Sequence, residues 1–170
     1  MEKNITPEYF RNNPAWDVVV LIPTLYRAKF LEVVLRTLAS QSVPAKEVLI
    51  IDQSEPEDIE VKMYKSFLNV LPMRVYHLSK KSKPVALNWC LELSKSPVIV
   101  SIDDDTEFDS NLIFNHLLSL HEHHVDCISG AVVHKNNPSL KASYRIPPAW
   151  ESGVYTLGHN PIVNYACMTL

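Results

Sequence analysis

Three consecutive carboxylates, Asp103, Asp104 and Asp105, carry the most specific chemistry in this sequence. They directly follow residues 98–102, an apolar run with the β-branched composition of a buried strand. Like charges this close together repel and raise each other's pKa. A divalent cation relieves that repulsion, and Mg²⁺ or Mn²⁺ prefers hard oxygen ligands of this kind. The triplet is therefore a candidate metal site, and a solvated acidic turn ahead of a helix is the alternative interpretation.

Polar residues also follow three other short apolar runs, at residues 18–22, 48–51 and 75–78. In open α/β sheets, ligands bind beyond the carboxyl ends of the strands. We therefore expect the residues after these runs to lie at one edge of a sheet, together with the aspartates. Those residues are Pro23, Thr24 and Tyr26 after the first run, Asp52 and Gln53 after the second, and Lys80, Lys81 and Lys83 after the third.

Helical patterns fill the gaps between the runs. Leu31, Val34, Leu35 and Leu38 fall at i, i+3, i+4 and i+7, on one face of a helix. Further helices are predicted over residues 59–70, with Ser54 and Glu57 as a capping box, over 87–95, and over 113–120, with Asp109 or Ser110 as the N-cap. Continuous apolar runs that alternate with helices predict an α/β fold, a mostly parallel sheet flanked by helices.

Composition narrows the class of protein. The 170 residues suit one domain, and the net charge of −3 does not favour a nucleic-acid partner. Cys90, Cys127 and Cys167 form no CxxC pair and no evident disulfide framework, which favours a reducing compartment. The sequence shows no signal peptide and no apolar run of membrane-spanning length. We expect a cytoplasmic protein, with peripheral association at the inner face of a membrane left open.

Four segments, taken in order, resemble family 2 glycosyltransferases of the GT-A fold. They are residues 18–24 with the Pro-Thr turn, 35–42 with a Leu-x-x-Leu-x-x-Gln helix, 48–54 with an acidic turn, and 98–105, the strand that enters the DXD motif. The resemblance implies a Rossmann-like fold of nucleotide-diphospho-sugar transferases. It divides the chain into an N-terminal extension (1–16), a nucleotide-sugar-binding region (17–133) and the start of an acceptor-side region (134–170), which we expect to be truncated.

The resemblance also implies roles for individual residues. Asp105 would bind Mn²⁺ or Mg²⁺, with Asp103 beside it at the start of the motif and close to the donor sugar or ribose. Asp104 would reach the ribose or the diphosphate, and Lys83 would lie near the phosphates. The remaining predicted donor-binding residues are Pro23, Thr24 and Tyr26 at the base and ribose, and Asp52 and Gln53 at the base. Gln53 departs from the family's Asp-Asp-Gly-Ser turn, although its amide offers both a donor and an acceptor.

The implied activity is the inverting transfer of a sugar from a nucleotide-diphosphate donor to the hydroxyl of a glycan or lipid-linked acceptor, in glycan or cell-surface polysaccharide synthesis. Inversion needs a carboxylate that takes the acceptor's proton. In the family this acid lies well beyond the DXD motif, and here no acidic residue follows Glu151. The catalytic base is therefore unassigned. Trp150 is a candidate on the acceptor side.

Two other functions compete with this one. A non-catalytic nucleotide-binding fragment or degenerate homologue would explain the missing base. A phosphatase of the haloacid dehalogenase type needs an Asp-x-Asp-x-Thr motif after the first strand, whereas Thr106 follows Asp105 directly and after the fourth strand. The four histidines at 116, 121, 123 and 124 lack the HExxH spacing of zinc proteases, and a polar helix end explains them better.

Overall fold

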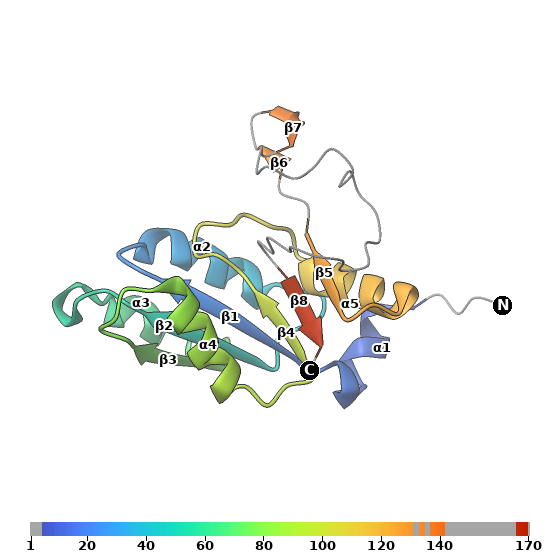
Figure 1. Ribbon diagram of the computed structural model, residues 1–170, viewed down its shortest axis with the longest axis horizontal. Helices are drawn as coiled ribbons and strands as arrows, with labels where there is room; N and C mark the ends of the chain where they lie inside the picture. The colour runs from blue at the N-terminus through green and yellow to red at the C-terminus, as the bar shows by residue number, and fades with distance from the viewer. Residues whose placement is uncertain (1–4, 131–132, 135–136, 142–165, 170) are drawn as a thin grey trace.

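A computed structural model describes residues 5–130, 133–134, 137–141 and 166–169. Its centre is a six-stranded sheet in the order β3-β2-β1-β4-β8-β5 (Figure 1). The parallel part comprises β1 (Val18–Thr24), β2 (Glu47–Asp52), β3 (Met73–His77) and β4 (Val98–Ser101). The strand β8 (Ala166–Thr169) lies antiparallel between β4 and β5 (Cys127–Ser129), and β6 (Val133–His134) forms a separate pair with β7 (Asn137–Lys141). The predicted mostly parallel sheet is confirmed.

Helices cover both faces of the sheet, which explains why β1 is buried along its whole length and why the middle of β2 is continuously apolar. Val18 and Val20 of β1 pack into one core, whereas Val19 and Leu21 pack into the other. The first core includes residues of α1 (Pro7–Arg11), α2 (Ala28–Ala39), α3 (Val61–Phe67) and α5 (Leu112–His123). The second core is closed by α4 (Lys83–Leu93). Two short 3₁₀ turns, η1 (Pro14–Trp16) and η2 (Pro56–Asp58), complete the described elements.

The N-terminal extension is packed onto the domain from α1 onward. Phe10 is almost completely buried, and its ring meets the rings of Trp16 and Phe114 edge to face. Aromatic pairs of this geometry add to the stabilisation that comes from burial alone. Helix α1, which lies within the predicted N-terminal extension, therefore packs into the same core as the helices that follow it.

The predicted capping box of the second helix is wrong. Helix α3 begins at Val61, and its N-cap, Glu60, makes no side-chain capping bond. Pro56 starts a 3₁₀ turn instead, so Glu57 lies in that turn rather than at a helix N3 position. Ser54 has a different role, because its hydroxyl oxygen accepts a hydrogen bond from the backbone N–H of Tyr26 at 2.9 Å.

The predicted N-cap of the fourth helix is also corrected. The N-cap is Asn111, and its own side chain makes no capping bond. Asp109 instead accepts the backbone N–H of Asn111 at 2.7 Å. The buried Gln41, at the end of α2, accepts the N–H of Ile113 and donates to the carbonyl of Asp109. A side chain distant in sequence therefore satisfies the start of α5.

Among the described residues, no helix is both long enough and apolar enough to cross a membrane. Most of the expected acceptor-side region, with Trp150 and Glu151, lies outside the described residues.

Candidate functional site

The strand order places a topological switch point at the carboxyl end of β1. From β1 the chain runs outward through β2 to β3, and then returns to β4 on the other side of β1. Connections that leave neighbouring strands in opposite directions open the sheet at this switch point, where ligands bind in α/β proteins. Thr24 pairs with Asp52, which in turn pairs with His77, so β1, β2 and β3 end at the same level.

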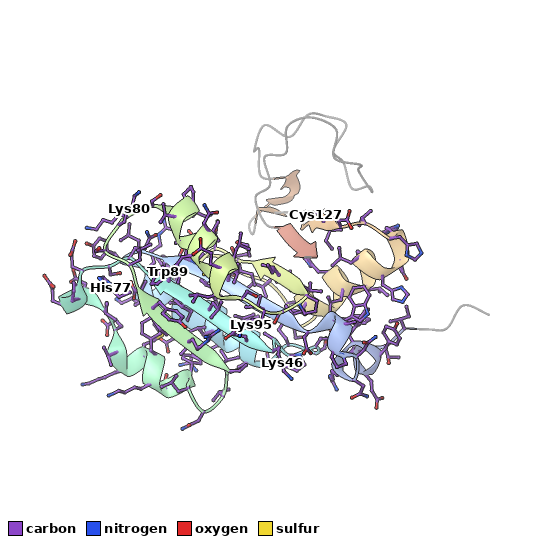
Figure 2. All side chains as sticks on the ribbon, turned by 60° about the horizontal axis from the view of Figure 1, so that its bottom comes forward. Lys46, His77, Lys80, Trp89, Lys95 and Cys127 are labelled. Carbon is purple, nitrogen blue, oxygen red and sulfur yellow. The ribbon has the colours of Figure 1, made fainter. Side chains whose placement is uncertain are left out.

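The acidic triplet lies beside this end of β1. The N–H of Ile102 donates to the carbonyl of Leu21 at 3.0 Å, which places the following aspartates next to the turn after β1. Figure 2 shows His77 and Lys80 at this end of the sheet, and Lys46 and Lys95 at the opposite end. The turns after all four parallel strands therefore share one edge, as expected from the sequence.

Asp104 points into the protein. Its Oδ2 accepts a hydrogen bond from the Thr24 hydroxyl at 2.7 Å, and its Oδ1 lies 3.3 Å from Nη1 of Arg27. Burial raises the pKa of Asp104, and the Thr24 hydrogen bond and the Arg27 charge oppose that rise. Both oxygens are thus engaged within the chain, and Asp104 ties the turn after β4 to the end of β1.

Asp103 and Asp105 lie nearer to solvent, and each forms an ion pair with a basic residue from a different loop. Asp105 pairs with Nη1 of Arg27 at 2.5 Å, and 44% of its side chain is exposed. Asp103 pairs with Nζ of Lys83, the first residue of α4. The negative charges of Asp104 and Asp105 raise the pKa of Arg27. The structure therefore brings Thr24, Lys83 and the three aspartates together, as the sequence predicted.

Asp52 and Gln53 are buried at the end of β2, next to the turn after β1. The two carboxylate oxygens of Asp52 accept hydrogen bonds from the N–H of Ser54 at 2.9 Å and from the hydroxyl of Tyr64 at 2.7 Å. The amide of Gln53 donates to the carbonyl of Lys80, and the Gln53 N–H donates to the carbonyl of Thr24 at 2.9 Å. The side chains of Asp52 and Gln53 therefore hold the neighbouring turns in place through hydrogen bonds. Pro23 is buried within β1.

Tyr26 projects from the turn after β1 with half of its surface exposed. Its φ of 58° lies in the left-handed region, which only a few per cent of residues other than glycine adopt. The Ser54 hydroxyl secures this conformation by accepting the Tyr26 N–H. Nζ of Lys81 lies 5.1 Å from the ring centroid and donates to the Tyr26 hydroxyl at 2.9 Å and to Glu55 at 2.6 Å. Three loops thus meet around an aromatic ring at the rim of the site.

Sequence reasoning missed the role of Arg27 as well as the roles of Ser54, Glu55, Tyr64 and Lys81. Arg27 was visible in the turn after the first strand, but nothing local connects it with aspartates 77 and 78 positions away. One available signal for Arg27 was the negative charge of the aspartate triplet, because adjacent carboxylates are stabilised by positive groups that come from elsewhere in the fold.

The donor set fits a divalent cation that a bound diphosphate helps to hold. Among the described residues, no three His, Cys, Asp or Glu side chains form a ready metal cage. Mg²⁺ is commonly bound by one or two carboxylates together with substrate phosphates and water. The exposed carboxylate of Asp105, with Asp103 two positions before it, suits that mode of binding.

An open cavity of about 530 Å³ lies at the other end of the sheet, where the parallel strands begin. Asp17 and Lys46 in its wall pair at 3.9 Å, and Glu47 pairs with Arg74. Lys95 also lines the cavity, so its charged residues leave one net positive charge. The general rule for α/β sheets, however, places binding at the carboxyl ends of the strands. The switch point beside β1 is therefore the candidate site.

Comparisons with known proteins give a family match and a set of structural neighbours. The chain matches the family described as Glycosyl transferase family 2 over residues 19–168. No curated protein matches it at a significant level.

Solved structures share its fold at low sequence identity. S. aureus TarS 1-349 in complex with UDP-GlcNAc is 21% identical, with a TM-score of 0.61 over 71% of this chain and 36% of that one. A mannosyltransferase, PcManGT from Pyrobaculum calidifontis in complex with GDP-Man and Mn²⁺, is 19% identical, with a TM-score of 0.61 over 78% and 43%. Glucosyl-3-phosphoglycerate synthase from Mycobacterium tuberculosis, in complex with Mn²⁺, UDP and glucosyl-3-phosphoglycerate, is 17% identical, with a TM-score of 0.57 over 80% and 51%.

This chain therefore spans only about half, or less, of the length of each of these three structures. They show the fold, which is the GT-A fold predicted from the sequence. The family match covers most of the chain, from β1 almost to the end of β8. The chain belongs to glycosyl transferase family 2.

Proposed function

We propose that this chain binds a nucleotide-diphosphate sugar at the switch point beside β1 and takes part in transferring the sugar to an acceptor hydroxyl. The observation that carries the proposal is the convergence of Thr24, Arg27, Lys83 and the aspartates Asp103 and Asp105 at the switch point of the sheet. Family membership supports it, as do structural neighbours that were solved with UDP-GlcNAc or GDP-Man.

The residues of the site divide into exposed side chains that are proposed to contact the donor and buried side chains that hold the loops in place. Tyr26 is the exposed aromatic side chain proposed to contact the nucleotide, and Pro23 and Thr24 form the buried end of β1 just before it. Asp52 and Gln53 hold the base-side loops in place through hydrogen bonds. Asp104, which is hydrogen-bonded to Thr24, is proposed to lie beside the ribose. Lys83, which pairs with Asp103, is proposed to lie beside the phosphates.

Asp105, together with Asp103, is proposed to hold Mn²⁺ or Mg²⁺ against the diphosphate. Neighbours solved with Mn²⁺ support a divalent cation. When bound, such a cation would stabilise the negative charge of the departing nucleoside diphosphate. Inversion of configuration, a glycan or lipid-linked acceptor and polysaccharide synthesis are proposals drawn from the sequence resemblance. A cytoplasmic location, with peripheral membrane association left open, is a proposal drawn from the composition of the sequence.

The alternative is a nucleotide-binding protein without transfer activity. In this alternative the donor is bound and not transferred, and no side chain of the 170 residues is assigned as the base that transfer needs. Release of nucleoside diphosphate in the presence of acceptors would distinguish the two functions, because a binder retains the donor intact.

The proposal is tested by thermal unfolding in the presence of UDP-sugars and GDP-sugars, each with and without Mn²⁺ or Mg²⁺. A ligand that binds only the native state raises Tm by mass action. We expect a nucleotide sugar with a cation to raise Tm more than either component alone. Asp105→Asn should remove the cation-dependent part of that rise and leave the unliganded Tm near that of the wild type.

Asp58→Asn is the matched control, because Asp58 is exposed on the 3₁₀ turn η2 and its side chain forms no hydrogen bond or ion pair with the other described residues. It should respond to donor and cation as the wild type does. If no nucleotide sugar shifts the wild-type Tm with either cation, the chain is not a donor-binding protein of this kind.

A further inference from the structure

Arg27 connects the two aspartates that differ most in their environment. It contacts buried Asp104 at 3.3 Å and exposed Asp105 at 2.5 Å, and it uses the same nitrogen, Nη1, for both. Half of the Arg27 side chain is exposed to solvent. A fork that donates two parallel hydrogen bonds to one carboxylate is the strong form of this ion pair. Arg27 does not use that form here, so another partner can displace it more readily.

The charge balance of the cluster suggests what that partner is. Three aspartates face two basic residues, Arg27 and Lys83, which leaves one net negative charge. Asp105 thus already has a positive neighbour at the position where the proposed cation would bind. Two positive groups cannot share that carboxylate without mutual repulsion. Arg27 contacts only Oδ2 of Asp105, but the repulsion still favours displacement of the guanidinium when a cation binds this carboxylate.

The displaced guanidinium has an obvious new partner in the donor. The planar guanidinium matches the oxygens of a phosphate group well and keeps its charge at all ordinary pH values. Arg27 lies at the N-cap of α2, directly after the turn that carries Tyr26. A diphosphate held by a cation on Asp105 would lie within the reach of the same side chain.

We propose that Arg27 competes with the divalent cation for Asp105 and transfers to the donor's diphosphate when the cation binds. Nucleotide and cation binding are then coupled through this one side chain. The cation alone binds weakly, since it must break the ion pair of Arg27 without compensation. A nucleoside diphosphate supplies that compensation, so each ligand strengthens the binding of the other by the same factor.

This inference rests on the proposed function, and its test uses the 170-residue chain with Mn²⁺ alone as the first probe. Free Mn²⁺ gives an electron paramagnetic resonance signal that is lost on binding, which yields a Kd without any activity measurement. Arg27→Gln should bind Mn²⁺ alone about three- to tenfold more tightly than the wild type, as expected for the loss of one competing ion pair of roughly 0.7 to 1.4 kcal/mol.

Calorimetric titration of UDP and GDP provides the second measurement. With saturating Mn²⁺, Arg27→Gln should bind the nucleoside diphosphate about tenfold more weakly, because it loses a charged hydrogen bond to phosphate. Mn²⁺ should therefore enhance nucleotide binding less in the variant than in the wild type. Uridine or guanosine, which lack the diphosphate, should show no difference between the two proteins.

Two further variants serve as controls. Arg36→Gln makes the same change of charge on the same helix, but Arg36 pairs with Glu32 one turn away, so both affinities should match the wild type. Arg27→Lys keeps the charge and loses the planar fork, so it should fall between the wild type and Arg27→Gln in both measurements. It also provides the test if Arg27→Gln fails to fold.

The outcomes separate this inference from the proposed function. Wild-type protein that shows no Mn²⁺-dependent binding of UDP or GDP overturns both. Mn²⁺-dependent binding in the wild type, with unchanged Mn²⁺ affinity in Arg27→Gln, overturns only the role of Arg27. A variant with tighter Mn²⁺ binding but undiminished affinity for the nucleotide would show competition without transfer, and would also overturn the proposal.

Discussion

Asp104 and Asp105 are neighbours in the sequence, but the turn after β4 directs one into the protein and the other towards solvent. The side chain of Asp104 is 7% exposed and that of Asp105 is 44% exposed. The two carboxylates therefore serve different purposes. The inner one binds the Thr24 hydroxyl and fixes the turn, while the outer one remains accessible to a cation and a ligand.

The burial of Asp104 predicts a pH dependence of stability. Its pKa in the folded state lies above the ordinary value of 3.8, chiefly because burial disfavours the charged form. The folded protein therefore holds this proton more tightly than the unfolded chain does. The stability that protonated Asp104 contributes is fully present at a pH below its ordinary pKa, and it is lost as the pH rises through the raised pKa of the folded state. The Asp104→Asn variant cannot ionise at this position, so its stability should not fall for this reason as the pH rises.

The measurement is the free energy of unfolding by urea for both proteins, at several values from about pH 4 to about pH 7. The stability of the wild type relative to Asp104→Asn should fall as the pH rises across this range. Asp58→Asn controls for the removal of an exposed carboxylate. A difference that stays constant, or that grows with pH, would contradict the assigned cause of the shift.

At the scale of elements, the loop that carries the aspartates is held from α2. Gln41 donates to the carbonyl of Asp109 at 2.7 Å and accepts the N–H of Ile113 at 3.1 Å. It is buried at the end of α2, which follows the turn of Arg27 along the chain. One amide therefore connects the segment after β1 with the loop after β4, the two segments that meet at the switch point.

Replacing Gln41 with Ala should destabilise the protein by about 1–3 kcal/mol, because it leaves buried backbone groups at the start of α5 unsatisfied. Ser40→Ala is the matched control, since the Ser40 hydroxyl bonds only the carbonyl of Thr37, three residues away, on an exposed surface. Urea unfolding of both variants measures the effect. Equal losses in the two variants would show that the Gln41 contacts are not what stabilises α5.

At the scale of the whole molecule, the two faces of the sheet are covered unequally. Helices α1, α2, α3 and α5 contribute to one core, whereas α4 closes the described part of the other with Ala86 and Cys90. Cys90 is completely buried, and burial raises the pKa of its thiol to about 12. Its reactivity therefore reports whether α4 remains on the sheet.

We expect Cys90 to resist alkylation near pH 8 in the native protein and to react fully in urea, because the thiolate is the reactive form and the site excludes the reagent. The other two cysteines are replaced by Ser, so that mass spectrometry follows Cys90 alone. A nucleotide and cation that stabilise the native state should slow the reaction further if it proceeds through global unfolding. Rapid labelling in the absence of urea would show that α4 leaves the sheet easily.

Much of the architecture could be predicted from local patterns. Continuous apolar runs indicated strands that are buried on both faces, and the buried stripe of Leu31, Val34, Leu35 and Leu38 is the one predicted for α2. The position of the triplet after β4 was also readable, because a charged group that follows a buried strand must lie at its end. The antiparallel place of β8 between β4 and β5 had no signal of this kind, since it depends on pairing between distant segments.

By itself, then, the sequence determined the four parallel strands, the approximate extents of α2 to α5, and which residues carry charge at the edge of the sheet, because burial and periodicity act within a few neighbouring residues. Only the tertiary structure decided how those charges are paired. Arg27 reaches the aspartates across 77 positions, and Ser54 supports Tyr26 instead of capping a helix. Contacts of this kind arise from the order of the strands, which brings distant turns together, so no local pattern records them.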